Sequence, residues 1–157
     1  MIEKVKDYFK QLGMEDRVIE LPASSATVEL AAKALSVAPC RIAKTLSFRV
    51  GGRVVLVVAA GDARVDNHKY KDFFGTKAKM LSAEEAETLV GHAVGGVCPF
   101  AVNDGVEVYL DKSLTRFQTV FPACGSANSA IELAPAALEE IASNFCGWVD
   151  VCKIAET

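Results

Sequence analysis

The chain has 157 residues, a formal net charge of −3 and a hydrophobic content of 51%. A chain of this length forms one domain and buries about 70% of its unfolded surface, so neither disulfides nor a metal is needed for folding. The composition excludes disordered and collagen-like classes, and the longest apolar run, Val54 to Ala60, is too short for a membrane helix. The first residues lack the apolar centre of a signal peptide, so we expect a soluble, cytoplasmic protein.

The predicted elements begin with an amphipathic helix at 2–12, where apolar residues recur at helical spacing. A short strand is expected at Arg17–Leu21. A second helix, from Val28 to Leu35, follows, with Ser24 or Ser25 placed to cap it.

Two strands, Ile42–Val50 and Arg53–Ala60, are predicted to form a hairpin. Gly51 and Gly52 lie between them and tolerate the positive φ that a tight hairpin turn requires. The second strand is apolar from Val54 to Ala60, which is typical of a strand buried on both faces.

The rest of the chain alternates between helical and strand patterns. Asp66 or Asn67 is placed to cap one helix, and the Ser82 to Glu85 segment has the capping-box pattern for another. The predicted helices are 67–74, 82–90 and 135–145, and the predicted strands are 106–110, 119–123, 130–133 and 148–152. This order predicts a mixed α/β (α+β) fold with one mixed sheet, in a single domain at 1–157.

The cysteines show neither a Cys-x-x-Cys pair nor zinc-site spacing; they are Cys40, Cys98, Cys124, Cys146 and Cys152. We therefore expect free, buried thiols, with no metal and no cofactor. No Ser/His/Asp or Cys/His motif is evident around His68 or His92, and Cys98 has no base near it in the sequence. No Walker loop or dinucleotide fingerprint occurs either.

Charge is unevenly distributed along the chain. Residues 30–79 contain ten Lys or Arg and three acidic residues, whereas residues 80–157 contain three basic and eleven acidic residues. Such a basic segment either attracts a phosphate-bearing partner to one face or is dispersed around the fold as solvated charge.

Two features break the local rules, and such breaks often mark a functional site. Lys44 begins an apolar row that continues with Leu46 and Phe48, so it either extends to solvent at the strand end or points into a cleft as a fixed cation. The Gly95–Phe100 loop places two glycines before Pro99; this pattern is found in ordinary turns and also in loops whose N–H groups bind an anion or a polarised carbonyl.

Several segments together resemble one family. They are Ala31–Leu35, Arg41–Phe48, Gly95–Phe100, Asp111–Leu114, Gly125–Asn128 and Ile131–Leu133. In this order and at this length, the chain resembles the YbaK/prolyl-tRNA-synthetase-associated domain family, free-standing relatives of the editing domain of bacterial prolyl-tRNA synthetases.

The resemblance implies a curved mixed sheet with helices outside it, and a trans-editing aminoacyl-tRNA deacylase. Such a hydrolase cleaves the 3′ ester of mischarged tRNA, here tRNA for proline with a small amino acid such as alanine or cysteine. The implied partners are the 3′-CCA end of aminoacyl-tRNA and prolyl-tRNA synthetase, and neither DNA nor a membrane is implied.

The resemblance also implies the site. The catalytic lysine of the family falls on Lys44, and its Gly-x-x-x-Pro loop comprises Gly95, Gly96, Val97, Cys98 and Pro99. The N–H groups of Gly96 through Cys98 are expected to bind the carbonyl, while Lys44 holds the terminal phosphate or adenosine. Substrate assistance by a group of the aminoacyl-tRNA itself takes the place of a protein base. The expected substrate-binding residues are Thr45, Phe100, Asp111, Ser113, Gly125, Ser126 and Asn128.

Two positions depart from the family pattern. Ala101 stands where relatives usually have glycine, and Thr45 stands where the alanine-specific branch has asparagine. Both departures bear on amino-acid specificity. Two alternatives to the deacylase reading are a non-catalytic module that binds tRNA or a synthetase through residues 30–79, and a deacylase with Cys98 as its nucleophile.

Overall fold

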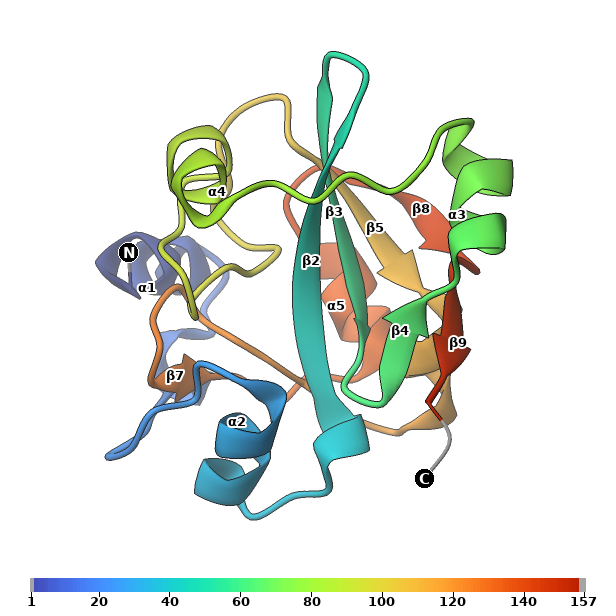
Figure 1. The fold of residues 1–157 in the computed structure, drawn as a ribbon. Coiled ribbons are helices and arrows are strands. Elements are labelled where there is room, and N and C mark those ends of the chain that lie inside the picture. The colour runs from blue at the N-terminus through green and yellow to red at the C-terminus, as the bar shows by residue number, and fades with distance from the viewer. Residues whose placement is uncertain (1, 156–157) are drawn as a thin grey trace.

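The computed structural model describes residues 2–155 and contains a five-stranded mixed sheet with the strand order β6-β2-β3-β5-β8 (Figure 1). The strands are β6 (Phe121–Pro122), β2 (Ile42–Val50), β3 (Arg53–Ala60), β5 (Glu107–Asp111) and β8 (Phe145–Val149). β2 and β3 are antiparallel, whereas the β2/β6, β3/β5 and β5/β8 pairs are parallel. The mixed sheet is therefore confirmed.

The predicted hairpin is confirmed at both ends. Val50 pairs with Arg53 across the turn, and of the two central glycines only Gly51 has a positive φ, of 59°. Every residue of β3 from Val55 to Ala60 is fully buried. The backbone of β3 pairs with parallel β5 on one side and with antiparallel β2 on the other. Its uninterrupted apolar sequence matches a strand whose two faces are both covered.

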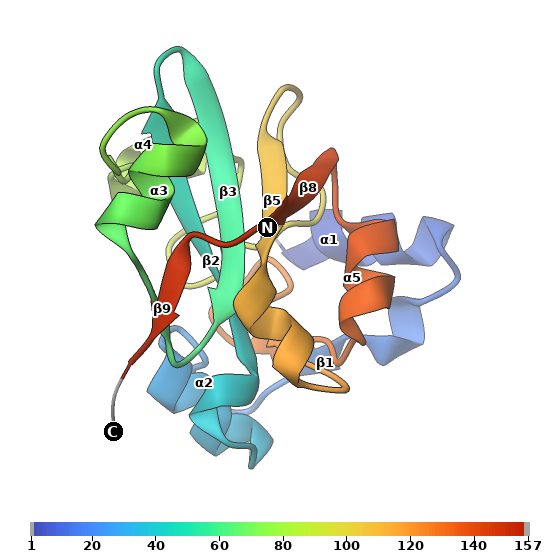
Figure 2. The same ribbon diagram turned by 90° about the vertical axis from the view of Figure 1, so that its right-hand side faces the viewer.

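Helices cover both faces of the sheet (Figure 2). They are α1 (Ile2–Gln11), α2 (Val28–Leu35), α3 (Asn67–Phe74), α4 (Ala83–Leu89) and α5 (Pro135–Ile141). On one face Phe9 of α1 packs against Phe100, with ring centroids 4.8 Å apart. On the other face Tyr70 of α3 packs against Phe48 of β2 at 5.0 Å.

The helix caps were predicted with mixed success. Asp66 caps α3 by accepting from the N–H groups of His68 and Lys69, and Ser82 and Glu85 form the capping box of α4. The cap of α2 is Thr27, whose hydroxyl accepts from Leu30, so the prediction of Ser24 or Ser25 is wrong. Thr27 directly precedes the helix, where a side-chain oxygen reaches the third N–H of the first turn.

The ends of several elements differ from the predictions. α1 ends one residue early, and the strand predicted at Arg17–Leu21 is reduced to β1 (Ile19–Glu20), because Arg17 ends a short 3-10 turn. β1 pairs with β7 (Ser129–Ala130), which is shorter than the 130–133 strand predicted there. The strand predicted at 119–123 is also shorter in the structure, where it is β6.

The C-terminal region contains the largest error. α5 ends at Ile141, and Phe145 begins β8 beside β5, whereas a helix was predicted as far as 145. Ala142 ends the helix, because it is extended, with a φ of −61° and a ψ of 140°. Asn144 lies in the turn that leads into β8: it has a φ of 43°, a left-handed conformation that asparagine tolerates, and its side-chain amide donates to the Val106 carbonyl at 2.9 Å.

Besides the five-stranded sheet and the β1–β7 pair, the described residues form a third sheet, which was not predicted. β4 (Ala63–Val65) pairs antiparallel with β9 (Cys152–Ile154), beside α3 (Figure 1). The single strand predicted at 148–152 is thus divided between β8 and β9. Strands of three residues carry too little alternation to be recognised in a sequence.

Among residues 2–155, no helix has both the length and the apolar character that crossing a membrane requires.

Candidate functional site

A cavity of about 280 Å³ lies between α2, one edge of β2, the start of α4 and the Gly95 loop. Because it contains Lys44 and part of that loop, we call it the main pocket, although it is smaller than two other clefts of about 390 and 760 Å³. Small apolar side chains provide much of its wall, including Ala31, Ala43, Ala86 and Ala130. Hydroxyl side chains provide much of the rest; they belong to Ser25, Thr27, Thr45, Ser47, Ser82 and Ser129. Lys44 is the one charged residue in the described lining.

The pocket lies where β2 has a gap in its backbone pairing. β6 pairs with Ile42 and Ala43 of β2, and further along Ser47 accepts from Leu81 and Arg49 donates to Lys79. In an antiparallel strand the N–H and C=O of alternate residues point to the same side, so Thr45, like Ser47 and Arg49, directs its backbone away from β3. Thr45 therefore presents one N–H and one C=O to the pocket.

Two hydroxyl oxygens in this wall have no hydrogen-bond partner among the described residues. They are Ser25 Oγ and Thr45 Oγ1, and both atoms are buried. A buried polar atom without a partner is costly, so its presence in a pocket wall favours a ligand that bonds to it. From its sequence position Ser25 was expected only as a helix cap, and Thr45 was expected in the site by resemblance alone.

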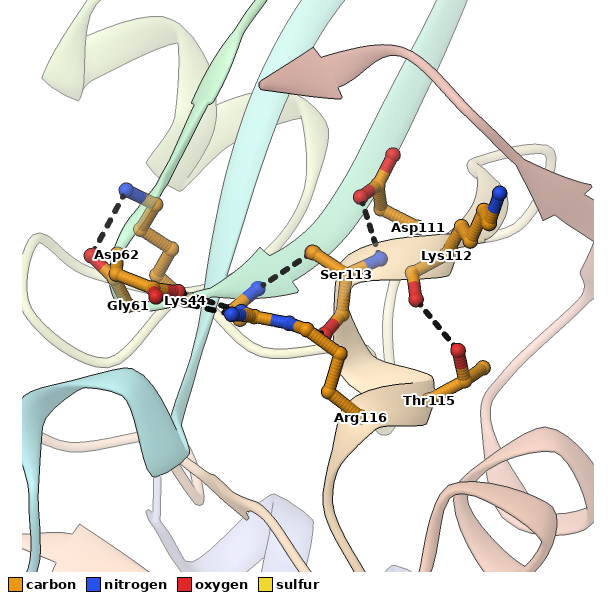
Figure 3. A network of polar contacts seen from close by, with 9 residues as sticks. Lys44, Gly61, Asp62, Asp111, Lys112, Ser113, Thr115 and Arg116 are labelled. Carbon is orange, nitrogen blue, oxygen red and sulfur yellow. Dashed lines mark hydrogen bonds and ion pairs between the residues drawn. The ribbon is translucent and has the colours of Figure 1, made fainter. Parts of the chain in front are cut away.

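Lys44 borders the pocket next to the turn after β3. Its side chain is half-buried and its Nζ donates to the Gly61 carbonyl at 3.4 Å (Figure 3). Burial lowers the pKa of Lys44, and the nearby Asp62 opposes this shift. Lys44 thus lies at the border of the pocket with its ammonium against a backbone carbonyl, and its role as a fixed cation for a ligand stays a prediction. The turn itself is tightly packed, because a Cβ on Gly61 would lie 2.0 Å from the Pro39 carbonyl oxygen.

Only part of the Gly95–Phe100 loop reaches the pocket. Gly95 and Val97 line it, whereas Cys98, Pro99 and Phe100 are buried in the core behind it. The Gly96 N–H donates to the Ala93 carbonyl at 3.0 Å, so it already has a partner in this structure, and its binding to a substrate carbonyl stays a prediction. The N–H groups of Gly95 and Val97 have no backbone partner among the described residues.

Gly96 has a packing role. A Cβ at this position would lie 2.6 Å from backbone atoms of Gly125 and Ser126, so the loop touches the 125–129 segment directly. Gly125 and Ser126 contact the loop at Gly96, whereas the side-chain amide of Asn128 donates to the Leu21 carbonyl at 3.2 Å. None of the three lines the main pocket, and their role in substrate binding stays a prediction. Their neighbours Ser129 and Ala130 line it instead.

Cys98 has a histidine neighbour that the sequence did not reveal. Its Sγ lies 3.5 Å from His92 Nε2, and both side chains are fully buried. However, His92 Nε2 lies 2.7 Å from the Phe100 carbonyl, which can only accept, so this nitrogen carries the proton. Burial raises the pKa of Cys98 to about 12 and lowers that of His92 to about 4. Both groups are neutral near pH 7, which opposes a thiolate nucleophile.

Asp111 and Ser113 lie outside the main pocket. They line a second cleft, on the side of β9 and α3, together with Lys69, Lys112, Arg116, Asp150 and Lys153. We call this the basic cleft. Asp111 is 1% exposed, and its carboxylate accepts from the Ser113 and Val151 N–H groups. Asp111 therefore organises the chain after β5; it does not line the main pocket, and its role in substrate binding stays a prediction.

The cysteines are free, as expected, but they are not all buried. Cys98, Cys124 and Cys152 are buried, Cys40 is half-buried and Cys146 is exposed. Burial raises the pKa of the three buried thiols.

Much of the basic segment at 30–79 is paired with acids from the rest of the chain. Arg41 pairs with Glu132, Arg49 with Glu85, Arg53 with Glu107 and Lys69 with Asp150. The excess of positive charge is therefore smaller on the surface than in the sequence.

Ala101, just after the loop, has a φ of 52°, and its N–H donates to the Ser143 hydroxyl at 2.9 Å. The left-handed backbone explains the glycine expected there, because glycine adopts this conformation without steric cost.

A curled half-barrel sheet, an open pocket at its edge and a lysine beside that pocket define the class of domain, and sequence comparison agrees. The profile of the aminoacyl-tRNA editing domain matches residues 23–141. The chain belongs to this family.

Two curated proteins illustrate what the chain is similar to. An uncharacterized protein, YwhH of Bacillus subtilis (strain 168), is 54% identical over 153 residues, covering 97% of each chain. Proline–tRNA ligase of Geobacillus thermodenitrificans (strain NG80-2) is 33% identical over 114 residues, which are 72% of this chain and 20% of the ligase.

Two solved structures have the same fold over nearly their whole length. A candidate trans-editing enzyme for prolyl tRNA synthetase superposes with a TM-score of 0.86 at 27% identity, covering 97% of this chain and 96% of that one. The hypothetical protein APE2540 superposes with a TM-score of 0.83 at 30% identity, covering 96% and 99%. The predicted family and fold class are confirmed.

Proposed function

We propose that this editing-domain protein acts in trans as an aminoacyl-tRNA deacylase. Its substrate is tRNA for proline that carries a small, uncharged amino acid such as alanine or cysteine. The observation that carries the proposal is the main pocket, in which one half-buried lysine stands among small apolar and hydroxyl side chains. Membership of the editing family supports the reaction class.

The size of the pocket supports a small amino acid. A volume of about 280 Å³ is close to the lower end of ligand pockets, roughly 300–1,000 Å³. The aminoacyl group has to share this space with part of the terminal ribose. Ser25 Oγ and Thr45 Oγ1 would hydrogen-bond polar atoms of the aminoacyl group, which satisfies both hydroxyls.

The reaction needs positioning and charge stabilisation more than a strong base, because an aminoacyl ester is already activated. Water adds to the carbonyl carbon, negative charge develops on the carbonyl oxygen, and the bond to the ribose oxygen then breaks. The ribose hydroxyl takes up a proton and the amino acid leaves as a carboxylate. Donors placed where the negative charge develops accelerate this step.

We assign the donors from the open groups of the pocket. The N–H groups of Gly95, Val97 and Thr45 are candidates for the carbonyl oxygen, in place of Gly96. The Lys44 ammonium is placed to hold the terminal phosphate or adenosine and to stabilise the developing charge. In this family a group of the substrate is thought to assist the water, so no protein base is assigned.

The editing domain is proposed to extend over residues 1–157, beyond the matched 23–141. Val5 and Phe9 before that range, and Val151 and Cys152 after it, belong to the same hydrophobic core. A tRNA substrate places the action in the cytoplasm, with prolyl-tRNA synthetase as the further partner.

The test is hydrolysis of tRNA for proline charged with alanine, cysteine or proline. We expect release of alanine or cysteine and retention of proline. Lys44→Ala should lower kcat/KM by about a hundredfold or more, the usual loss for one donor to a developing oxyanion. Lys33→Ala is the matched control, because Lys33 is an exposed cation of α2 outside the pocket lining.

No hydrolysis of any mischarged tRNA, at protein concentrations that bind tRNA, would contradict the proposal. Salt-dependent binding without turnover would instead favour the non-catalytic module.

A further inference from the structure

Two cations face each other on the β4–β9 sheet. Arg64 of β4 is directly opposite Lys153 of β9, and both side chains are exposed, whereas Ala63 and Cys152 on the inner side are buried. Like charges in directly opposite positions destabilise a strand pair. Within residues 2–155 neither cation takes part in an ion pair. This pair is therefore a cost to folding, and a bound anion would relieve it.

The basic cleft lies next to this pair and has a volume of about 390 Å³. Its acidic groups are already occupied. Asp150 pairs with Lys69, and Asp111 accepts from backbone N–H groups in the interior. Lys112 and Lys153 line the cleft, are exposed and take part in no ion pair within the described range. The charge available to a ligand is thus positive.

The cleft is linked to Lys44 through one turn (Figure 3). The Gly61 carbonyl accepts from Lys44, and the next residue, Asp62, forms a two-bond ion pair with Arg116 at 3.0 and 2.6 Å. Arg116 Nε also donates to the Ser113 carbonyl at 2.9 Å. β4 begins directly after this turn, at Ala63. A chain-like ligand whose end lies at Lys44 can therefore continue over Arg64 and Lys153.

We propose that Arg64, Lys153 and Lys112 bind the phosphodiester backbone of the RNA stem that leads to the aminoacylated 3′ end. The inference rests on the proposed function, which places that end beside Lys44. Charge complementarity identifies the occupant, since a run of phosphates matches three separated, unpaired cations. These contacts recognise the backbone and carry no sequence information.

The experiment measures binding of an uncharged RNA hairpin that ends in single-stranded CCA. The test variant is Arg64→Ala/Lys153→Ala. The control is Lys10→Ala/Lys77→Ala, which removes the same charge from two exposed lysines outside both clefts. Dissociation constants are measured over a range of salt concentrations. We expect the slope of log affinity against log salt to fall by about 1 for each cation removed in the test variant, and to be unchanged in the control.

Wild-type affinity and slope in the test variant would overturn the inference, and so would an equal loss in the control. The inference would also be overturned if the wild type bound phosphatidylserine vesicles more tightly than the hairpin and the test variant lost this preference. Arg64→Ala should also unfold at the same or a higher temperature, because the like-charge pair is removed. A lower unfolding temperature together with weaker binding would point to a structural role and contradict the inference.

A small substrate separates this inference from the proposed function. With alanine esterified to adenosine, which has no stem, the test variant should match the wild-type kcat/KM. If neither protein hydrolyses any ester, the proposed function fails, while the hairpin measurement still decides whether the cations bind RNA.

Discussion

The main pocket and the basic cleft lie on either side of the Gly61–Asp62 turn and differ in the chemistry of the side chains that line them. The pocket combines small apolar side chains and hydroxyls with one cation, whereas the cleft combines four cations with two occupied carboxylates. The first composition suits selection by size and hydrogen bonding, and the second suits long-range attraction of phosphate. If the proposed function holds, discrimination of the amino acid and capture of the tRNA are therefore expected to be separable in this small domain.

The largest effect is expected where the two sites meet. Gly61→Ala places a Cβ 2.0 Å from the Pro39 carbonyl oxygen and 2.8 Å from a Val28 methyl group, so the turn has to move. We expect the free energy of unfolding to fall by about 3 kcal/mol, at the upper end of overpacking costs, with loss of both deacylation and RNA binding. Denaturant unfolding measures the first effect.

Gly52→Ala is the control for this change, since a Cβ there meets nothing within 4 Å and the residue has no positive φ. If Gly61→Ala were as stable as Gly52→Ala and kept either activity, the turn would not be the shared support of the two sites.

The second prediction concerns pH and affects the pocket alone. Burial lowers the pKa of Lys44, so its ammonium loses the proton at a pH below the ordinary value of 10.5. Deacylation should therefore decline on the alkaline side before pH 10.5, and in Lys44→Arg this decline should move to higher pH, because arginine stays charged. Rates with alanyl-adenosine across pH measure this effect.

The lowered pKa of Lys44 also makes the stability of the fold depend on pH. Between the folded-state pKa of Lys44 and 10.5, the unfolded chain binds more protons than the folded chain, so rising pH stabilises the fold in that interval.

If the deacylation rate declined at the same alkaline pH in the wild type and in Lys44→Arg, another group would be the one that titrates.

The third prediction concerns a residue that belongs to neither site. Cys98→Ala should keep kcat/KM within about twofold of the wild type, because a neutral thiol with a pKa of about 12 is a poor nucleophile. Iodoacetamide should label the exposed Cys146 well before Cys98. A hundredfold loss of kcat in a folded Cys98→Ala protein would restore Cys98 as the nucleophile.

The smallest effect is expected at Ala101. This residue does not line the main pocket, so, in contrast to the bearing on specificity expected from the sequence, its replacement should change stability without changing either activity. Ala101→Gly relieves a φ of 52° and should raise the free energy of unfolding by about 1 kcal/mol. Ser36→Gly, at a φ of 57° in the C-cap of α2, is a matched comparison remote from the loop. Unchanged stability in Ala101→Gly would mean that the left-handed backbone is not strained.

The sequence predicted those parts of the fold that local patterns determine. β2, β3 and α3 were predicted with their observed ends, because long apolar runs, a glycine turn and an Asp cap act within a few residues. β4 and β9 were missed because three-residue strands depend on a partner 87 to 91 positions away in the chain. Helix α5 was predicted too long because strand pairing beside β5 overrides helical propensity after Ile141.

The site was predicted unevenly for a related reason. Lys44 and the Gly95 loop were found because each breaks a local rule, and the structure brings both to one pocket. Whether Asp111 and Gly125 face that pocket depends on the sheet face and the layer to which each belongs. Neither the face nor the layer can be predicted from a local sequence motif. The Cys98–His92 contact was missed although only six positions separate the residues, because the loop fold that brings them together has no helical or strand period.

The gap in the pairing of β2 has a consequence for solubility. An exposed strand edge invites pairing with another chain and hence aggregation. Here the unpaired backbone is confined to the neighbourhood of Thr45 by β6 on one side and by residues 79–81 on the other. A strand of another chain needs several consecutive unpaired backbone positions in order to pair, whereas a small ester needs only one. The β2 edge thus keeps backbone hydrogen-bonding groups open for a ligand without offering a long run of unpaired backbone to another copy.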